Sequence, residues 1–207
     1  MAGSFAVVYL VRGAFTRGMA ELPVGGTVSA VGPLGGAFSR PASAEATAVM
    51  VAGGVGAPPL YFHASELVRT GFPVDRITVI NGARTASMLI AGDDFVALGV
   101  DARITTDDGS AGVRGLVTDE LRRMLDAGPV SSVCACGPTP MLRAVADVCA
   151  ASSTPCQISV ETLMPCGMGV CMGCVVKRRD PASETGFSYA RACHDGPVFD
   201  AQELIWE

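Results

Sequence analysis

From about residue 46 onward, apolar runs of strand length alternate with longer amphipathic segments. The short apolar runs predict buried β-strands, and the longer segments between them predict helices because their apolar residues recur at helical spacing. Alternation of strand and helix predicts an α/β fold built on a parallel, doubly wound sheet with helices on both faces. The predicted strands lie at 46–56, 75–84, 101–109, 129–138 and 156–165, and the predicted helices at 58–71, 85–99, 117–128 and 139–152.

End signals support two of these helices. Pro58 and Pro59 suit a first helical turn, and Gly71 suits the position just after a helix. Thr118 is expected to cap the helix that Gly128 ends.

The chain before residue 46 has a different pattern. The runs FAVVYLVRG at 5–13 and GGTVSAVGPLG at 25–35 are short, β-like and bounded by glycine and proline. They resemble the last strands of an antiparallel unit and are too few to close a barrel by themselves.

Composition narrows the class of protein. Hydrophobic residues make up 49% of the 207 residues and charged residues 17%, which is typical of a folded globular chain. The net charge of −5 argues against nucleic-acid binding, because phosphate contacts need clustered Lys and Arg. No signal peptide is recognisable, and no apolar run reaches the roughly 20 residues of a spanning helix. We therefore expect a cytoplasmic protein without a membrane span.

The eight cysteines are distributed unevenly, and three of them fall within nine positions. Cys166, Cys171 and Cys174 have the spacing Cys-x4-Cys-x2-Cys, and Cys193 follows at a distance. This is the plant-type ferredoxin spacing, so these four residues are predicted to ligate a [2Fe–2S] cluster. A zinc ribbon is the alternative, but it usually needs two short Cys-x2-Cys knuckles, and only one is present. Cys149 and Cys156 fit no such pattern and are interpreted as small buried hydrophobic residues.

Two turns at predicted strand ends are candidates for nucleotide binding. AGGVGAPPL lies between a predicted strand and a predicted helix, and the N-terminus of a helix favours phosphate binding. The turn departs from the G-x-G-x-x-G motif, and glycines at such a turn are often purely structural. CACGPTPML ends a later predicted strand. The thiol of Cys136 could lie against a nicotinamide ring, or it could be a buried thiol in a plain turn. Both turns share one sheet edge if the strands are parallel. The predicted NAD contacts are Gly53, Gly54, Gly56, Cys136, Gly137, Pro138 and Met141.

Four motifs stand in one order: GPLGGAF at 32–38, AGGVGAPPL at 52–60, CGP at 136–138 and the cysteine loop that ends in CHDGPVF at 193–199. In this order the chain resembles the electron-transfer subunit of class B dihydroorotate dehydrogenase, within the ferredoxin–NADP reductase superfamily. The match includes GPLGGAF, NGAR at 81–84, TTDDGSAGVRGLVT at 105–118 and ETLMPCGMGVCMGC at 161–174. The resemblance implies residues 1–44 as the remnant of an FAD-binding β-barrel, 45–160 as an NAD-binding α/β domain and 161–207 as a [2Fe–2S] subdomain.

The same resemblance implies a function and a partner. Electrons would pass from NADH through FAD and the cluster to the FMN of a catalytic subunit that interconverts orotate and dihydroorotate in pyrimidine biosynthesis, within a heterotetramer. About half of the expected barrel is absent, and Leu10 and Phe15 stand where family members often have Arg and Gly. The flavin contacts implied by the resemblance are Val8, Tyr9, Leu10, Phe15 and Thr16.

Two other functions are compatible with the sequence. One is a related iron–sulfur flavoprotein reductase subunit, of the sulfide dehydrogenase or ferredoxin–NADP transhydrogenase type. The other is a zinc-stabilised binding module without redox activity. The run MPCGMGVCMGC favours the dihydroorotate dehydrogenase subunit over the related reductase subunit, and visible absorption would distinguish a cluster protein from the zinc module.

Overall fold

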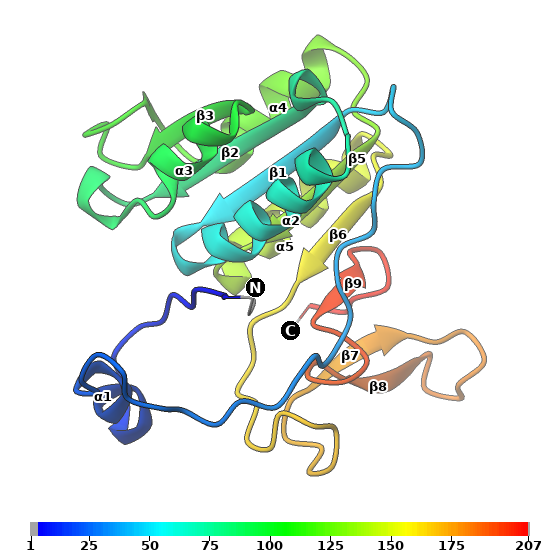
Figure 1. Cartoon of the computed structure of the whole chain (residues 1–207). Coiled ribbons are helices and arrows are strands. Elements are labelled where there is room, and N and C mark those ends of the chain that lie inside the picture. The colour runs from blue at the N-terminus through cyan, green and yellow to red at the C-terminus, as the bar shows by residue number, and fades with distance from the viewer. Residues whose placement is uncertain (1–3, 207) are drawn as a thin grey trace.

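A computed structural model describes residues 4–206 and shows an α/β core flanked by two smaller parts (Figure 1). None of the helices in this range is long and apolar enough to cross a membrane. The strands are β1 (Ala48–Gly53), β2 (Ile77–Ala83), β3 (Asp101–Thr106), β4 (Val113–Arg114), β5 (Ser132–Cys136), β6 (Cys156–Ser159), β7 (Val175–Arg179), β8 (Phe187–Arg191) and β9 (Val198–Asp200). The helices are α1 (Ala14–Ala20), α2 (Ala57–Arg69), α3 (Gly92–Leu98), α4 (Val117–Ala127) and α5 (Thr139–Ala151), with short 3₁₀ turns at Gly54–Gly56, Val74–Arg76 and Ala86–Met88.

Seven strands form the main sheet in the order β4-β3-β2-β1-β5-β6-β9. All neighbouring pairs from β4 to β6 are parallel, and β9 closes the edge antiparallel to β6. The strand order reverses at β1, because the chain first extends the sheet through β2 to β4 and then returns to place β5 on the other side of β1. Such a reversal opens a crevice at the carboxyl ends of β1 and β5, where doubly wound proteins bind ligands. The predicted α/β class with its parallel sheet is confirmed.

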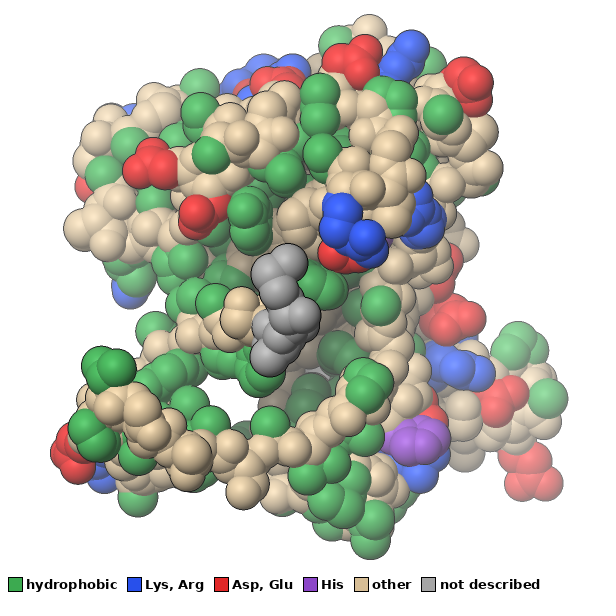
Figure 2. All heavy atoms as spheres, in the orientation of Figure 1, with side chains coloured by type: hydrophobic (Ala, Val, Ile, Leu, Met, Phe, Trp, Pro, Cys, Tyr) green, Lys and Arg blue, Asp and Glu red, His purple; other side chains and the backbone are tan. Residues whose placement is uncertain are grey.

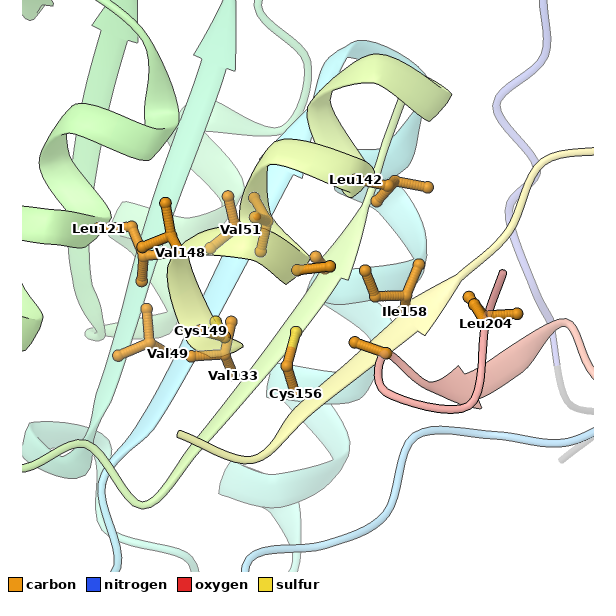
Figure 3. Packing of buried hydrophobic residues seen from close by; sticks show 14 of the residues in the cluster. Val49, Val51, Leu121, Val133, Leu142, Val148, Cys149, Cys156, Ile158 and Leu204 are labelled. Carbon is orange, nitrogen blue, oxygen red and sulfur yellow. The ribbon is translucent and has the colours of Figure 1, made fainter. Parts of the chain in front are cut away.

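Each face of the sheet has its own core, because side chains alternate along β1. Met50 and Ala52 pack under α2 and α3, together with Leu60 and Phe95. Val49 and Val51 face the opposite side, where α4 and α5 cover them (Figure 3). The second core also contains Cys149 and Cys156, which are 1% and 4% exposed, so their interpretation as buried hydrophobic residues is confirmed.

The N-terminal 44 residues differ from the prediction in their local structure. Residues 5–13 and 25–35 are extended but pair with no strand in the described chain, and α1 lies between them. A strand is stabilised by neighbours that satisfy its backbone groups, and an extended segment without them stays open. Gly36 alone forms a bridge, with Pro197, and its amide donates to the Gly196 carbonyl.

Two helix predictions need correction. The helix expected at 85–99 is confined to α3, because Ala91 has a left-handed φ of 59° and the preceding residues form a 3₁₀ turn and a loop. Thr118 is not the cap of α4. The N-cap is Leu116, two residues earlier, and Asp119 Oδ2 accepts a hydrogen bond from its amide at 3.1 Å, while Thr118 is buried in the first turn.

The C-terminal part consists of a cysteine loop followed by the antiparallel hairpin of β7 and β8. Beyond the hairpin, β9 joins the main sheet, so residues on both sides of the predicted boundary at 160 share one sheet. Figure 1 shows the loop that follows β6 running away from the sheet at its carboxyl edge, on the same side as the N-terminal segment. The domain boundaries themselves stay a prediction.

Candidate functional site

The glycine turn after β1 and the CGP turn after β5 pack directly against each other. A Cβ atom on Gly56 would collide with the backbone carbonyl of Cys136, and one on Gly53 would lie 2.5 Å from Met141 Sδ. Gly54 has a φ of +53°, which glycine adopts without strain. Helix α2 begins directly after this turn, so its free backbone N–H groups point toward the crevice. The two turns predicted from the sequence therefore form one site.

A cavity of about 560 Å³ extends from this junction along the carboxyl ends of β2 and β3. Gly53, Gly54, Pro138 and Met141 line it, as predicted for an NAD site. Its volume and its largely apolar lining suit a cofactor or substrate.

The far half of this cavity was missed at the sequence level. Thr105, Asp107 and Arg84 line it, together with the N-terminal turn of α4. The Thr105 hydroxyl is buried and has no hydrogen-bond partner, so it is free to bind a polar group of a ligand. Arg84, Thr105 and Asp107 lie in the motifs NGAR and TTDDGS, which follow two neighbouring strands and would have pointed to this half of the cavity. Asp108 accepts a hydrogen bond from the Ser110 amide at 2.9 Å within the turn that follows β3.

A second cavity, of about 250 Å³, separates the glycine turn from the cysteine loop. Gly56, Cys136 and Gly137 line one side, and Glu161, Thr162 and Met164 line the other. Burial raises the pKa of the Cys136 thiol, although a hydrogen bond with Ser159 opposes this. The Thr162 hydroxyl is buried without a hydrogen-bond partner. This cavity lies between the two turns that follow β1 and β5 and the cysteine loop, and the Thr162 hydroxyl is free there to bind a ligand.

The four predicted ligand cysteines form two pairs. Cys174 Sγ and Cys193 Sγ are 3.4 Å apart, and both residues are buried. Cys166 and Cys171 lie at the outer side of the loop, where the Cys171 side chain contributes to the lowered pKa of Cys166. Within residues 4–206, no three His, Cys, Asp or Glu side chains converge as ligands of one metal ion. Two thiol pairs suit a cluster of two irons better than one tetrahedral zinc, which needs all four sulfurs at a single point.

Backbone amides are directed at these sulfurs. The Gly169 amide donates to Cys193 Sγ at 3.1 Å, and the Gly173 amide donates to Cys171 Sγ at 3.4 Å. Amides of Cys171, Met168 and Val170 lower the pKa of Cys166 to about 6. Amides that stabilise thiolate also stabilise the sulfur ligands of an anionic cluster, and Gly167 and Gly169 need the positive φ angles that shape the loop. The residues present therefore fit a [2Fe–2S] cluster.

The predicted flavin contacts lie on the N-terminal segment. Val8 and Leu10 are exposed on its extended part, and Phe15 is 76% exposed on α1. The Thr16 hydroxyl is occupied locally, because it accepts from the amides of Arg12 and Gly13 at 2.9 and 3.0 Å. In Figure 2, hydrophobic side chains gather along this segment, and an open window separates part of it from the rest of the molecule. None of the predicted flavin contacts lines either cavity described above.

Two family models match the chain. Residues 161–205 match the iron-sulfur cluster binding domain of dihydroorotate dehydrogenase B, and residues 50–147 match the oxidoreductase NAD-binding domain. The electron transfer subunit of dihydroorotate dehydrogenase B (NAD(+)) from Geobacillus kaustophilus is 38% identical over 205 residues, which cover 98% of this chain and 75% of that protein. The chain belongs to this family. The family is that of the electron transfer subunits of an NAD-dependent oxidoreductase, which confirms the resemblance read from the four motifs.

Further relatives agree with this assignment. The subunit of the same name from Caldanaerobacter subterraneus subsp. tengcongensis is 35% identical over 97% of this chain and 75% of its own length. A solved structure of an NADH-dependent reduced ferredoxin-NADP oxidoreductase, described for flavin-based electron bifurcation, superposes with a TM-score of 0.79 at 30% identity. That superposition covers 96% of this chain and 67% of the other. The cytochrome b5 reductase domain of Ulva prolifera nitrate reductase shares the fold alone, with 24% identity and a TM-score of 0.51.

Proposed function

We propose that this chain passes electrons from NADH, through FAD and a [2Fe–2S] cluster, to the FMN-containing catalytic subunit of a dihydroorotate dehydrogenase. The observation that supports this most directly is the order of the three sites along one edge of the molecule. The large cavity at the strand ends adjoins the smaller one, and Met164 of the smaller cavity is two residues from Cys166. A flavin between these sites would couple the two-electron chemistry of nicotinamide to the one-electron chemistry of a cluster.

NADH would bind in the crevice between β1 and β5, where electron transfer begins. Gly53 and Gly54 allow the backbone to approach the cofactor closely, and the N-terminal turn of α2 supplies a positive dipole for its phosphates. Thr105 and Asp107 would contact the far end of the dinucleotide, because they line the opposite end of the same cavity.

The flavin, which would accept electrons from NADH, would lie in the smaller cavity. Its unpaired Thr162 hydroxyl and the Cys136–Ser159 pair would hold the polar edge of a ring against the nicotinamide. Val8, Tyr9, Leu10, Phe15 and Thr16 line neither cavity, so they would contact this cofactor only where it extends beyond the smaller cavity along the N-terminal segment, whose exposed apolar side chains need a partner.

The outer end of the path is an apolar surface around the cluster loop. Leu163 is 87% exposed and Val170 is 76% exposed, and Met168 and Met172 are each 51% exposed. Cys171 is also exposed among them. An exposed apolar patch at the point where electrons leave suits a docking surface for the catalytic subunit. We propose a heterotetramer of two copies of each subunit in the cytoplasm.

Reconstitution tests this function. The full chain is co-expressed with an FMN-containing dihydroorotate dehydrogenase catalytic subunit and purified without oxygen. We expect a complex that absorbs between roughly 400 and 550 nm and reduces orotate with NADH. A colourless chain with stoichiometric zinc would contradict the cluster assignment, and a coloured chain that forms no complex would contradict the choice of partner.

A second candidate rests on the solved bifurcating oxidoreductase, which superposes over nearly the whole chain. In that case the acceptor would be a ferredoxin–NADP transhydrogenase partner. The same preparation, offered reduced ferredoxin and NADP in place of orotate, distinguishes the two. Turnover with orotate alone supports the first function.

A further inference from the structure

We infer that Arg191 is a positioning residue for the cluster, which holds the loop of the first three cysteines against the strand end that carries the fourth. Arg191 is the last residue of β8, two positions before Cys193, and lies outside the ligand set. Its role concerns the cluster and not the acceptor, so it rests only on the cluster assignment within the proposed function.

One side of the Arg191 guanidinium is fixed by Asp195. Arg191 Nε donates to Asp195 Oδ2 at 3.0 Å, and Nη2 donates to Oδ1 at 2.9 Å, which is a two-pronged pairing. The Arg191 amide also donates to Asp195 Oδ2, at 2.8 Å. Such fork geometry is specific to arginine and leaves little freedom to the side chain. The pKa of Asp195 is held far below its usual range by these bonds, so the carboxylate stays charged.

The other side of the guanidinium reaches across to the cysteine loop. Arg191 Nη1 donates to the Gly169 carbonyl at 3.0 Å. The amide of the same Gly169 donates to Cys193 Sγ at 3.1 Å. Arg191 therefore fixes the residue that binds the fourth cysteine's sulfur. The two segments are already tight there, because a Cβ on Gly169 would lie 3.0 Å from the Cβ of His194.

His194 completes the group without replacing Arg191. Its Nδ1 lies 2.9 Å from Asp195 Oδ1 and 3.3 Å from Arg191 Nη2. It is 58% exposed at the side chain, whereas Arg191 and Asp195 are each 30% exposed. Arg191 is thus the member of this group whose side chain bonds the first cysteine segment, through the Gly169 carbonyl.

Arg191 also brings a positive charge close to the cysteine sulfurs, because the Gly169 residue whose carbonyl it binds donates its amide to Cys193 Sγ. Reduction of the cluster adds one electron, and hence one negative charge, to an already anionic group. A nearby guanidinium stabilises that added charge, so Arg191 raises the reduction potential.

The test compares Arg191→Gln and Arg191→Lys in the full chain. Release of iron to a chelator is followed by the loss of visible absorption without oxygen. Outer contacts of metal ligands typically change metal retention about tenfold or more, and we expect both variants to lose iron faster by about that factor. Lysine keeps the charge but cannot bind Asp195 by a fork and reach Gly169 as well. Arg178→Gln is the matched control, because Arg178 is an exposed arginine on the neighbouring β7.

A redox titration followed by electron paramagnetic resonance separates charge from position. We expect a lower potential in Arg191→Gln and a smaller shift in Arg191→Lys. Asp195→Asn, which weakens the fork from the other side, should also release iron faster, and binding of ADP-ribose shows that the α/β core of each variant is folded. Iron release at the wild-type rate in the Arg191 variants overturns the positioning role, and an unchanged potential in Arg191→Gln overturns the electrostatic one.

Discussion

The chain contains cysteines of two kinds, which differ in what surrounds their sulfur atoms. Amides of the cysteine loop point at the sulfurs of Cys166, Cys171 and Cys193. Cys134 has no such donors, and burial alone raises its pKa to about 12. The loop amides therefore stabilise thiolate at Cys166, whereas burial and the neighbouring Cys174 raise the pKa of Cys193 against the effect of the Gly169 amide.

Replacing Cys171 with Ser should abolish retention of the cluster, because a hydroxyl is a poor substitute for thiolate as an iron ligand. Visible absorption and iron content measure this. Cys149→Ala is the control, since Cys149 lies in the core and is expected to leave the colour unchanged. Full cluster absorption in Cys171→Ser would refute the ligand assignment.

Gly56→Ala tests the junction of the two nucleotide-type turns. The added methyl group would meet the backbone carbonyl of Cys136, which cannot rotate away. We expect affinity for ADP-ribose to fall by about tenfold, equal to roughly 1.4 kcal/mol, as measured by calorimetry. Gly18→Ala is the control, because nothing lies within 4 Å of a Cβ at that position. Equal affinity in the two variants would show that the close packing is not required.

At the scale of elements, helix α4 is tied to strand β3 by a buried carboxylate. Glu120 is 8% exposed, and its Oε1 accepts from Arg103 Nη1 at 2.8 Å while its other oxygen pairs with Arg123. Arg103 also binds Asp101, at 2.9 Å. These pairs hold the N-terminal half of α4 beside the strand whose carboxyl end lines the large cavity.

Glu120→Ala should lower the free energy of unfolding by roughly 2 kcal/mol, because it leaves Arg103 without its buried partner. This loss of stability is smaller than the loss expected for a fully buried ion pair, because Arg103 and Arg123 are both partly exposed. Urea unfolding measures it. Glu66→Ala is matched to it, because Glu66 pairs with Arg69 on the surface of α2 at 2.7 Å. We expect no measurable loss there, and a loss equal to that of Glu120→Ala would contradict this account.

Helix α2 also anchors the chain that enters the sheet, through a contact between Phe38 and His63 with ring centroids 5.5 Å apart. Burial, with a smaller effect of Arg40, lowers the pKa of His63 below its ordinary 6.5. The unfolded chain then binds a proton at a higher pH than the folded chain. The contribution of His63 to stability is complete above about pH 6.5 and is lost as the pH falls toward the folded pKa.

The stability of the wild-type chain should therefore fall between about pH 7.5 and about pH 5.5 by more than that of His63→Gln. Urea unfolding at both pH values gives the comparison. The same pH dependence in both proteins would show that His63 is not responsible.

At the scale of the whole molecule, the sheet, the cysteine loop and the N-terminal segment meet at one side, where the carboxyl ends of the strands point (Figure 1). The large cavity, the small cavity and the cluster loop follow one another there. The exposed apolar residues of the loop face outward at the end of this series. A catalytic partner that docks on them would stand next to the cluster.

Val170→Glu should weaken association with the catalytic subunit by about tenfold or more, because it places a charge in an apolar contact. Val96→Glu, on the exposed face of α3, is the control at a similarly exposed valine. Size-exclusion chromatography and titration of one subunit with the other measure association, and the visible spectrum verifies that the cluster is intact. Undiminished association in Val170→Glu would place the partner elsewhere.

The alternation of strands and helices followed from the sequence, because buried strands of a parallel sheet are continuous apolar runs. The sequence also predicts Cys166, Cys171, Cys174 and Cys193 as cluster ligands, because ligand spacing is local. The start of α4 differed from the prediction. Leu116 became the N-cap in place of Thr118, because the preceding loop starts the helix earlier, and Asp119 binds the Leu116 amide from the third helical position.

Contacts between segments distant in the sequence depended on the assembled fold. Thr105 and Asp107 became part of the large cavity because β3 is parallel to β2 and ends at the same edge. Arg191 came to bind Gly169 because the β7–β8 hairpin returns the chain to the cysteine loop. The segments at 5–13 and 25–35 have strand-like sequences but no strand beside them, and strand formation depends on a partner's backbone. Spacing along the chain fixes local chemistry, whereas contacts between distant segments arise only when the sheet and hairpin assemble.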